Sequence, residues 1–158
     1  MNIFVLDKNP KQAAEWHVDK HVVKMPLETA QMLCTILNQL GVKTPYKSTH
    51  VKHPCTIWAG ESMDNFIWLC ELGLELCKEY TYRYEKEHKC ESIIKECLTY
   101  ACKVPNNGIT KFVQAMPNDL KLDNPVEGYK NYYIKAKNHI ASWKKRKVPS
   151  WFNLKEIK

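Results

Sequence analysis

The chain has 158 residues, a formal net charge of +7 and a hydrophobic fraction of 44%. This hydrophobic fraction excludes a disordered chain, and no apolar run approaches the roughly 20 residues that a membrane span requires. The seven cysteines are odd in number, and residues 1–7 lack the basic and apolar regions of an export signal, so we expect a reducing, cytoplasmic setting.

The first predicted element is a short extended arm over residues 1–7, followed by a long helix. Asn9 before Pro10 is typical of an N-cap with proline at the first helical position, and Gly41 is a natural stop. Pro26 lies inside this span, where proline removes a backbone donor and clashes with the preceding turn. We therefore expect a kinked or broken first helix.

After a connection over residues 42–54, the helical period returns from Cys55 to Tyr84, and Ser62 is placed to cap a second segment of it. A shorter helix is predicted over residues 91–102. The cysteines of these segments lie among apolar residues, so we expect them, with one of the first helix, to behave as small core hydrophobes: Cys34, Cys70, Cys77, Cys97 and Cys102.

Residues 103–123 form a long irregular stretch, and irregular stretches of this length are commonly functional or mobile. A capping box at Asn124 opens a last helix that we expect to extend to about Lys145. The aromatic tail over residues 148–158 is expected to pack back on the body. These elements predict an all-α fold, a compact helical domain that spans residues 1–158.

Two stripes of side chains run along the first helix when residues 17–36 are projected at the helical step of about 100° per residue. The apolar stripe predicts the core face: Val18, Val22, Met25, Thr29, Met32, Leu33 and Ile36. The ionisable stripe has spacings of i, i+4, i+7 and i+11: His17, His21, Lys24 and Glu28. Two imidazoles, an amine and a carboxyl on one line make this face the candidate catalytic site.

Two interpretations of the ionisable stripe need no metal. In the first it is a solvated face, with an ion pair between Lys24 and Glu28 that contributes a few tenths of a kcal/mol, about 0.3. In the second it carries out acid–base or nucleophilic chemistry: Glu28 or His21 moves protons, and Lys24, if desolvated, forms a Schiff base. The second interpretation is our main hypothesis, and it requires no cofactor.

The third interpretation is a metal site. His17 and His21 are one helical turn apart, so they can share one ion, and the following loop offers further donors in His50, His53 and Cys55. The spacing of the loop donors matches none of the familiar zinc-finger patterns. A metal-dependent hydrolase that uses His17 and His21 is therefore an alternative function.

The loop over residues 45–55 mixes cations, hydroxyls and an aromatic ring, a composition suited to gripping phosphate while a ring stacks on a base. The candidate nucleic-acid-binding residues of this loop are Tyr46, Lys47, His50, Lys52 and His53. His53, which precedes Pro54, is also placed to cap the next helix.

The segment from residue 128 onward is strongly basic, and Lys155 and Lys158 extend its charge to the end of the sequence. Its densest run adds four candidate nucleic-acid-binding residues: Lys144, Lys145, Arg146 and Lys147. Such a run attracts polyanions by counterion release, although a lysine-rich composition also serves solubility. We expect DNA as the partner, bound through its backbone or shape, with no membrane partner and a monomeric chain.

Several short motifs resemble the pyrimidine-dimer DNA glycosylases of the phage T4 endonuclease V type. They are the N-terminal arm, the helix centred on His17 with a hydrophobe–proline pair at Met25 and Pro26, the His53-Pro54 helix entry, and the aromatic tail over residues 147–152. That family cuts the glycosidic bond at a damaged base and then nicks the abasic site. The resemblance implies base excision with an AP-lyase step on DNA that contains a damaged or modified base.

The sequence departs from this family at the reactive groups. The family uses the amine of an N-terminal threonine exposed by removal of methionine, whereas here we expect Met1 to be retained because Asn2 is large. The family's catalytic glutamate precedes the hydrophobe–proline pair, where this sequence has Lys24, and the nearest carboxylate on the same face is Glu28. We predict rebuilt chemistry on these residues and His21. A related base-modifying reaction, or a non-enzymatic nucleic-acid-binding or viral accessory protein, is the alternative.

Overall fold

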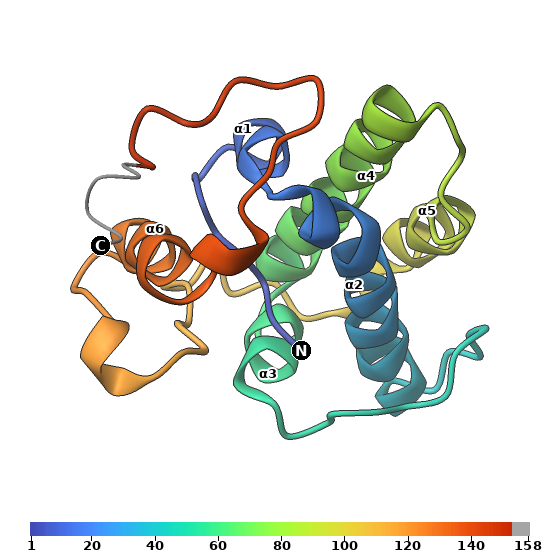
Figure 1. The fold of residues 1–158 in the computed structure, drawn as a ribbon. Helices are drawn as coiled ribbons and strands as arrows, with labels where there is room; N and C mark the ends of the chain where they lie inside the picture. Colours follow the sequence, from blue (N-terminus) through green and yellow to red (C-terminus); the bar gives the residue numbers. More distant parts are fainter. Residues whose placement is uncertain (153–158) are drawn as a thin grey trace.

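Two long helices, α2 (Asp19–Gln39) and α4 (Met63–Tyr84), lie at the centre of the computed structural model (Figure 1). The structure describes residues 1–152, and within this range every regular element is helical, which confirms the predicted all-α class. The shorter elements are α1 (Pro10–Trp16), α3 (Pro54–Gly60), α5 (Glu91–Thr99), α6 (Pro125–Ala136) and the 3-10 helices η1 (Ala101–Lys103), η2 (Asn118–Leu120) and η3 (Asn138–Ile140). In this range no helix has both the length and the apolar composition to cross a membrane.

The first predicted helix is interrupted at His17 and Val18, between α1 and α2. The predicted break at Pro26 is wrong, because α2 runs through that residue, and the kink stays a prediction. The guanidinium of Arg83 on α4 stabilises the interruption: it donates to the backbone carbonyls of Glu15 (2.9 Å) and His17 (2.8 Å). These carbonyls lie at the end of α1, where a helix leaves acceptors without intrahelical partners.

Side-chain caps begin the helices where the sequence predicted them. The side chain of Asn9 accepts a hydrogen bond from the backbone N–H two residues later and caps α1. Ser62 and Asn124 cap α4 and α6 in the same way. His53 also caps α3, because its Nδ1 accepts from the backbone N–H of the second helical residue at 3.1 Å. Gly41 follows α2 with a φ of 84°, in the left-handed region that favours glycine.

The last helix, α6, ends at Ala136 and not near Lys145 as predicted. After η3, the chain turns back over α1, where the indole of Trp143 donates to the carbonyl of Trp16 at 2.8 Å. The ring of Trp151 contacts Trp16 edge-on, with centroids 5.8 Å apart. These indole contacts favour a fold-back over continuation of the helix, and they confirm that the tail packs on the body as far as residue 152. Lys155 and Lys158 lie outside the described residues.

The core combines the predicted apolar stripe of α2 with the N-terminal arm. Every residue of that stripe is buried, and so are Ile3, Phe4, Val5 and Leu6, which run between the helices (Figure 1). Six of the seven cysteines are buried, but the prediction for Cys102 is wrong, because it follows the end of α5 and is exposed. The buried arm brings the first residues of the chain against α2, where the ionisable stripe lies.

Candidate active site

A pocket of about 200 Å³ opens where the N-terminal arm meets α2 and α6. We call it the Glu28 pocket, and it is lined by Met1, Asn2, Phe4, His21, Lys24, Met25, Glu28, Tyr132 and Lys137. Three members of the ionisable stripe, His21, Lys24 and Glu28, therefore share one wall. The fourth, His17, is not part of the lining.

The carboxylate of Glu28 is the centre of this pocket. Glu28 is 7% exposed. Its Oε1 lies 3.3 Å from the amine of Met1 and accepts a hydrogen bond from the backbone N–H of Asn2 at 3.0 Å. The amine of Lys24 lies 3.8 Å from Oε2, on a side chain that is 69% exposed. Two primary amines thus contact one shielded carboxylate, the amine of Met1 from inside the fold and that of Lys24 from solvent.

Asn2 fixes the arm beside Glu28. Its side-chain amide donates to the carbonyl of Ala115 (2.9 Å), and its Oδ1 accepts from the hydroxyl of Tyr129 on α6 (2.8 Å) and the thiol of Cys55 on α3 (3.7 Å). Asn2 is thus held by α3, by α6 and by the segment that contains Ala115. Because these hydrogen bonds restrict its movement, its backbone N–H keeps a fixed position beside Glu28. The pocket is therefore preorganised around the carboxylate.

His21 forms an uncharged part of the wall. Its ring stacks on Phe4 at 4.2 Å, and its Nδ1 is 2.7 Å from the hydroxyl of Tyr133. Burial, with smaller contributions from the charges of His17, Lys137 and Lys24, lowers the pKa of His21 to about 3. A neutral imidazole of such low basicity is a poor proton acceptor near pH 7, so of the two proton carriers that the sequence suggested, Glu28 is the better suited.

His17 lies in the core at the interruption between α1 and α2. It is 0% exposed; its Nδ1 donates to the carbonyl of Ala13 at 2.6 Å, and its Nε2 has no hydrogen-bond partner. Burial lowers its pKa to about 4. The prediction that His17 shares the catalytic face is wrong for a physical reason: the helical projection assumed one continuous helix across this position.

The predicted metal donors are only partly assembled. The rings of His17 and His21 have centroids 6.3 Å apart, and those of His50 and His53 are 6.4 Å apart in the loop before α3. Among residues 1–152, no group of three or more His, Cys, Asp or Glu side chains is placed to hold a metal ion.

The loop over residues 45–55 packs on α2 through Thr49, whose backbone N–H donates to the hydroxyl of Thr35 at 3.0 Å. Burial lowers the pKa of His53, the positive charges of the N-terminal amine and His50 lower it further, and the charge of Glu28 opposes them. At the end of the loop, the thiol of Cys55 donates to Oδ1 of Asn2, which lines the pocket, at 3.7 Å. The loop therefore ends at a residue that contacts the pocket lining.

The remaining candidates in this loop have different exposures. Lys47, His50 and Lys52 are exposed, as a phosphate contact requires. Tyr46 is half-buried, with its hydroxyl 3.6 Å from the thiol of Cys90, a hydrogen bond that raises the pKa of the tyrosine to about 12. Its ring is therefore anchored toward α5, so its predicted use as a free stacking surface has little support in the structure.

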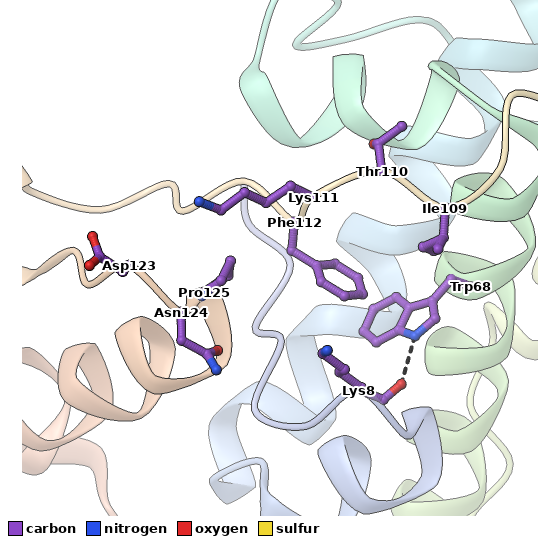
Figure 2. A pocket seen from close by; sticks show the side chains of 9 residues that line it. All are labelled: Lys8, Trp68, Ile109, Thr110, Lys111, Phe112, Asp123, Asn124 and Pro125. Carbon is purple, nitrogen blue, oxygen red and sulfur yellow. Dashed lines mark hydrogen bonds between the residues drawn. The ribbon is translucent and has the colours of Figure 1, made fainter.

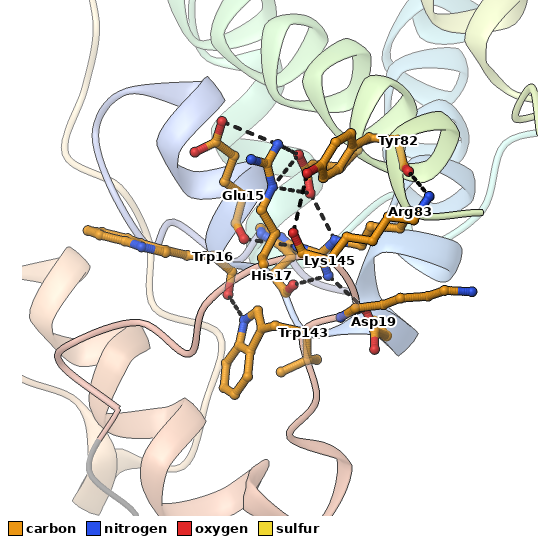
Figure 3. A network of polar contacts seen from close by, with 12 residues as sticks. Glu15, Trp16, His17, Asp19, Tyr82, Arg83, Trp143 and Lys145 are labelled. Carbon is orange, nitrogen blue, oxygen red and sulfur yellow. Dashed lines mark hydrogen bonds and ion pairs between the residues drawn. The ribbon is translucent and has the colours of Figure 1, made fainter. Parts of the chain in front are cut away.

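A second charged cluster, which we call the Arg83 cluster, fills the junction of α1, α2 and α4 (Figure 3). It consists of Glu15, Asp19, Glu79, Arg83 and Arg146. Arg83 is 0% exposed and donates to Glu79 (2.8 Å) and Asp19 (2.9 Å) in addition to the two carbonyls of α1. Arg146 pairs with both glutamates of the cluster, and its guanidinium lies 4.2 Å from the centroid of the Tyr82 ring.

The basic run over residues 144–147 packs against α4 and was predicted to bind nucleic acid. The amine of Lys144 lies 5.1 Å from the centroid of the Tyr84 ring, that of Lys145 donates to a carbonyl at the end of α4 at 3.1 Å, and Arg146 belongs to the Arg83 cluster. Lys147 is exposed. Three of the four cations therefore anchor the C-terminal segment, and their binding to DNA stays a prediction.

The sequence did not predict six residues of the Glu28 pocket as site residues: Met1, Asn2, Phe4, Met25, Tyr132 and Lys137. The first three lie in the arm, which has no periodic pattern, and Met25 was predicted as part of the core. Tyr132 lies on α6, and the amine of Lys137 lies 5.2 Å from the centroid of its ring. Only the burial of the arm brings the side chains other than Met25 to α2.

No protein-family model, curated protein or solved structure matches the chain. The resemblance to pyrimidine-dimer glycosylases therefore stays a prediction. A functional inference must rest on the geometry of the sites themselves.

Proposed function

We propose that this protein is a base-excising DNA glycosylase with a lyase step, and that the Glu28 pocket is its active site. The observation that carries the proposal is the shielded carboxylate of Glu28 in contact with the amines of Met1 and Lys24. A primary amine is the nucleophile that a Schiff-base mechanism requires, and a neighbouring carboxylate can take and return its protons.

The chemistry assigns two tasks to Glu28. First it accepts a proton from the ammonium, so that the free amine attacks C1′ of the deoxyribose while the bond from C1′ to the base breaks and the base leaves with the electron pair. The nitrogen then gives up a proton to the departed base, and Glu28 returns its own proton to O4′ as the bond from C1′ to O4′ breaks. The sugar ring is then open, the nitrogen forms an iminium with C1′, and Glu28 is a carboxylate again. Removal of a proton from C2′ next expels the 3′-phosphate, and the same carboxylate is placed to accept this proton.

The surroundings of the pocket suit a DNA substrate. The rings of Phe4 and His21 and the side chain of Met25 provide an uncharged wall for a sugar or base. Lys24 and Lys137 supply positive charge at the rim, where phosphates of a bound strand would lie. The exposed Lys47 and Lys52 add positive charge on the loop that packs on α2 at Thr35, further along the same helix.

Borohydride trapping tests the proposal directly. Duplexes that carry a panel of damaged or modified bases, and one with an abasic site, are incubated with the protein and borohydride. Reduction of the iminium is expected to leave a covalent adduct, and the peptide that carries it identifies Met1 or Lys24 as the nucleophile. Absence of both product and adduct on every substrate would contradict the proposal, and salt-sensitive binding without product would favour the non-enzymatic alternative.

A further inference from the structure

A larger cavity, of about 790 Å³, has no lining residue in common with the Glu28 pocket (Figure 2). It lies between the end of the arm, the first turns of α4, residues 109–112 and the start of α6. The lining residues that carry the argument are Lys8, Trp68, Lys111, Phe112 and Asp123. Its volume falls in the range of about 300–1,000 Å³ that is usual for small-molecule sites.

One wall of this cavity is aromatic. The rings of Trp68 and Phe112 contact each other with centroids 4.8 Å apart, and Trp58 supports Phe112 from behind at 5.0 Å. The indole N–H of Trp68 donates to the carbonyl of Lys8 at 2.9 Å, which fixes the ring plane. The two ring planes are inclined at 61° and Trp68 is buried, so a planar ligand would stack on the half-buried Phe112 with the indole at its edge.

The loops that frame the cavity are also fixed. The buried Asn65 accepts from the backbone N–H of Thr110 (3.0 Å) and donates to its hydroxyl (2.7 Å). The side chain of Gln114 both donates to and accepts from the backbone of Leu122, at 2.7 Å and 3.1 Å. Gly128 on α6 leaves the space that this side chain occupies, because a Cβ there would overlap it. The cavity is preformed, as ligand sites usually are.

Two cations border the aromatic wall. Lys8 and Lys111 are exposed, and neither forms an ion pair with a carboxylate among residues 1–152. Figure 2 shows their side chains around the same space as the two rings. Asp123 lies on the α6 side of the cavity, where a carboxylate suits a hydroxyl or an amino group and repels a phosphate. The cavity thus has an aromatic wall, a cationic rim and one carboxylate.

We propose that this cavity is a nucleotide-binding site, with the nucleobase against Trp68 and Phe112 and the phosphate between Lys8 and Lys111. Stacking on an aromatic side chain contributes about 1–3 kcal/mol per base, and it tolerates any base because every base has a π-face. Unpaired lysines provide the charge-assisted contacts that a phosphate needs. The proposal does not depend on excision at Glu28, and the ligand is either a free nucleotide or a nucleotide of a DNA strand.

Calorimetric titration tests the proposal with the four deoxynucleoside monophosphates, their nucleosides and a short single-stranded oligonucleotide. The monophosphates are expected to bind about tenfold more tightly than the nucleosides, because the latter lack the charged contact. Binding of the monophosphates assigns the site to free nucleotides. Binding of the oligonucleotide alone, weakened by the same substitutions, assigns it to a DNA strand, and both results support the nucleotide chemistry.

Single substitutions locate the site. Lys8→Gln and Lys111→Gln are each expected to weaken phosphate-dependent binding about tenfold, and Phe112→Leu to weaken nucleotide and nucleoside binding alike. Lys95→Gln removes the same charge from α5, away from the cavity lining, and should bind as the parent does. Thermal unfolding of each variant separates loss of the site from loss of the fold.

Three outcomes would overturn the proposal: no binding of any probe, nucleosides that bind as tightly as nucleotides, or lysine variants of the cavity that bind like Lys95→Gln. Glu28→Gln separates the two proposals, because it should abolish excision and leave nucleotide binding unchanged. Nucleotide binding by a protein that excises no base would refute the function proposed for the Glu28 pocket and leave this site standing.

Discussion

The Arg83 cluster and the Glu28 pocket are built from similar groups but differ in how completely those groups are paired. Arg83 is fully buried, and its guanidinium donates to two carboxylates and two carbonyls. Glu28 is also shielded, but its partners include the solvent-exposed amine of Lys24, and a cavity opens beside it. The first arrangement leaves little capacity for a ligand, whereas the second retains donors and space.

This difference separates a structural role from a chemical one. A buried ion network with every group paired holds segments together, and loss of one member leaves a charge without a partner. A carboxylate with amines at the edge of a cavity can exchange protons with a bound molecule.

The largest expected effect is on activity and follows from the substitution of Glu28. Glu28→Gln keeps the shape of the side chain but removes its proton-accepting charge, so excision and borohydride trapping should fall by about 100-fold to 10,000-fold. Single-turnover measurements on the substrate found by trapping give the rate. Glu75→Gln, on α4 outside the pocket lining, is the matched control and should retain full activity. Comparable rates for both variants would remove Glu28 from the mechanism.

Substitution of Arg83 should instead lower stability. Arg83→Met preserves most of the buried volume but leaves Asp19 without its ion-pair partner and Glu79 with Arg146 alone, which is expected to cost about 3–5 kcal/mol of the free energy of unfolding. Urea titration followed by circular dichroism measures the change. Lys78→Met removes an exposed cation from the same helix and should cost less than about 1 kcal/mol. A cost for Arg83→Met no larger than the control's would contradict the structural role.

The buried imidazoles predict a loss of stability in acid. The pKa of His17 is lowered to about 4 in the folded chain, below the ordinary value of 6.5, so the unfolded chain binds the proton more tightly. Stability is therefore complete above pH 6.5 and falls as the pH drops from 6.5 toward 4, by about 2 kcal/mol at pH 5 for this one group.

His17→Asn isolates this contribution because asparagine can donate a hydrogen bond but does not titrate in this range. Between pH 7 and pH 5 the variant should lose about 2 kcal/mol less of its free energy of unfolding than the parent does. His139→Asn, at an exposed position, should follow the parent. Equal acid sensitivity of all three proteins would show that His17 is not a buried neutral base.

The features that the sequence predicted well are local ones. Asn9, Ser62 and Asn124 cap their helices because capping depends on residues two or three positions away. The apolar stripe is buried as projected, because all its residues after Val18 lie on the continuous helix α2. His21, Lys24 and Glu28 lie on the same helix, so their shared wall was predictable as well.

The features that the sequence did not reveal depend on distant contacts. The interruption at His17 depends on Arg83, more than sixty positions along the chain, and no local pattern indicates this pairing. The early end of α6 depends on the contact of Trp143 with α1. Phe4 and Lys137 reach the pocket only because the arm is buried and α6 packs beside it. The local periodicity of the sequence contains no information on these contacts between distant segments.

The smallest expected effect is on the salt dependence of DNA binding. It distinguishes a lysine beside the Glu28 pocket from one beside the Arg83 cluster. Lys137 lines the Glu28 pocket, whereas Lys145 is held by a carbonyl of α4 (3.1 Å) and by Glu85 (3.6 Å). If the strand follows the pocket, Lys137→Gln should lower the slope of log K against log salt concentration by about 1, and Lys145→Gln should change it by much less. Fluorescence anisotropy at several salt concentrations measures both slopes. Lys145→Gln should have the smaller effect because a lysine already paired within the chain releases fewer counterions than one that is free to meet a phosphate. If Lys145→Gln instead lowers the slope more than Lys137→Gln does, the DNA lies on the segment over residues 144–147.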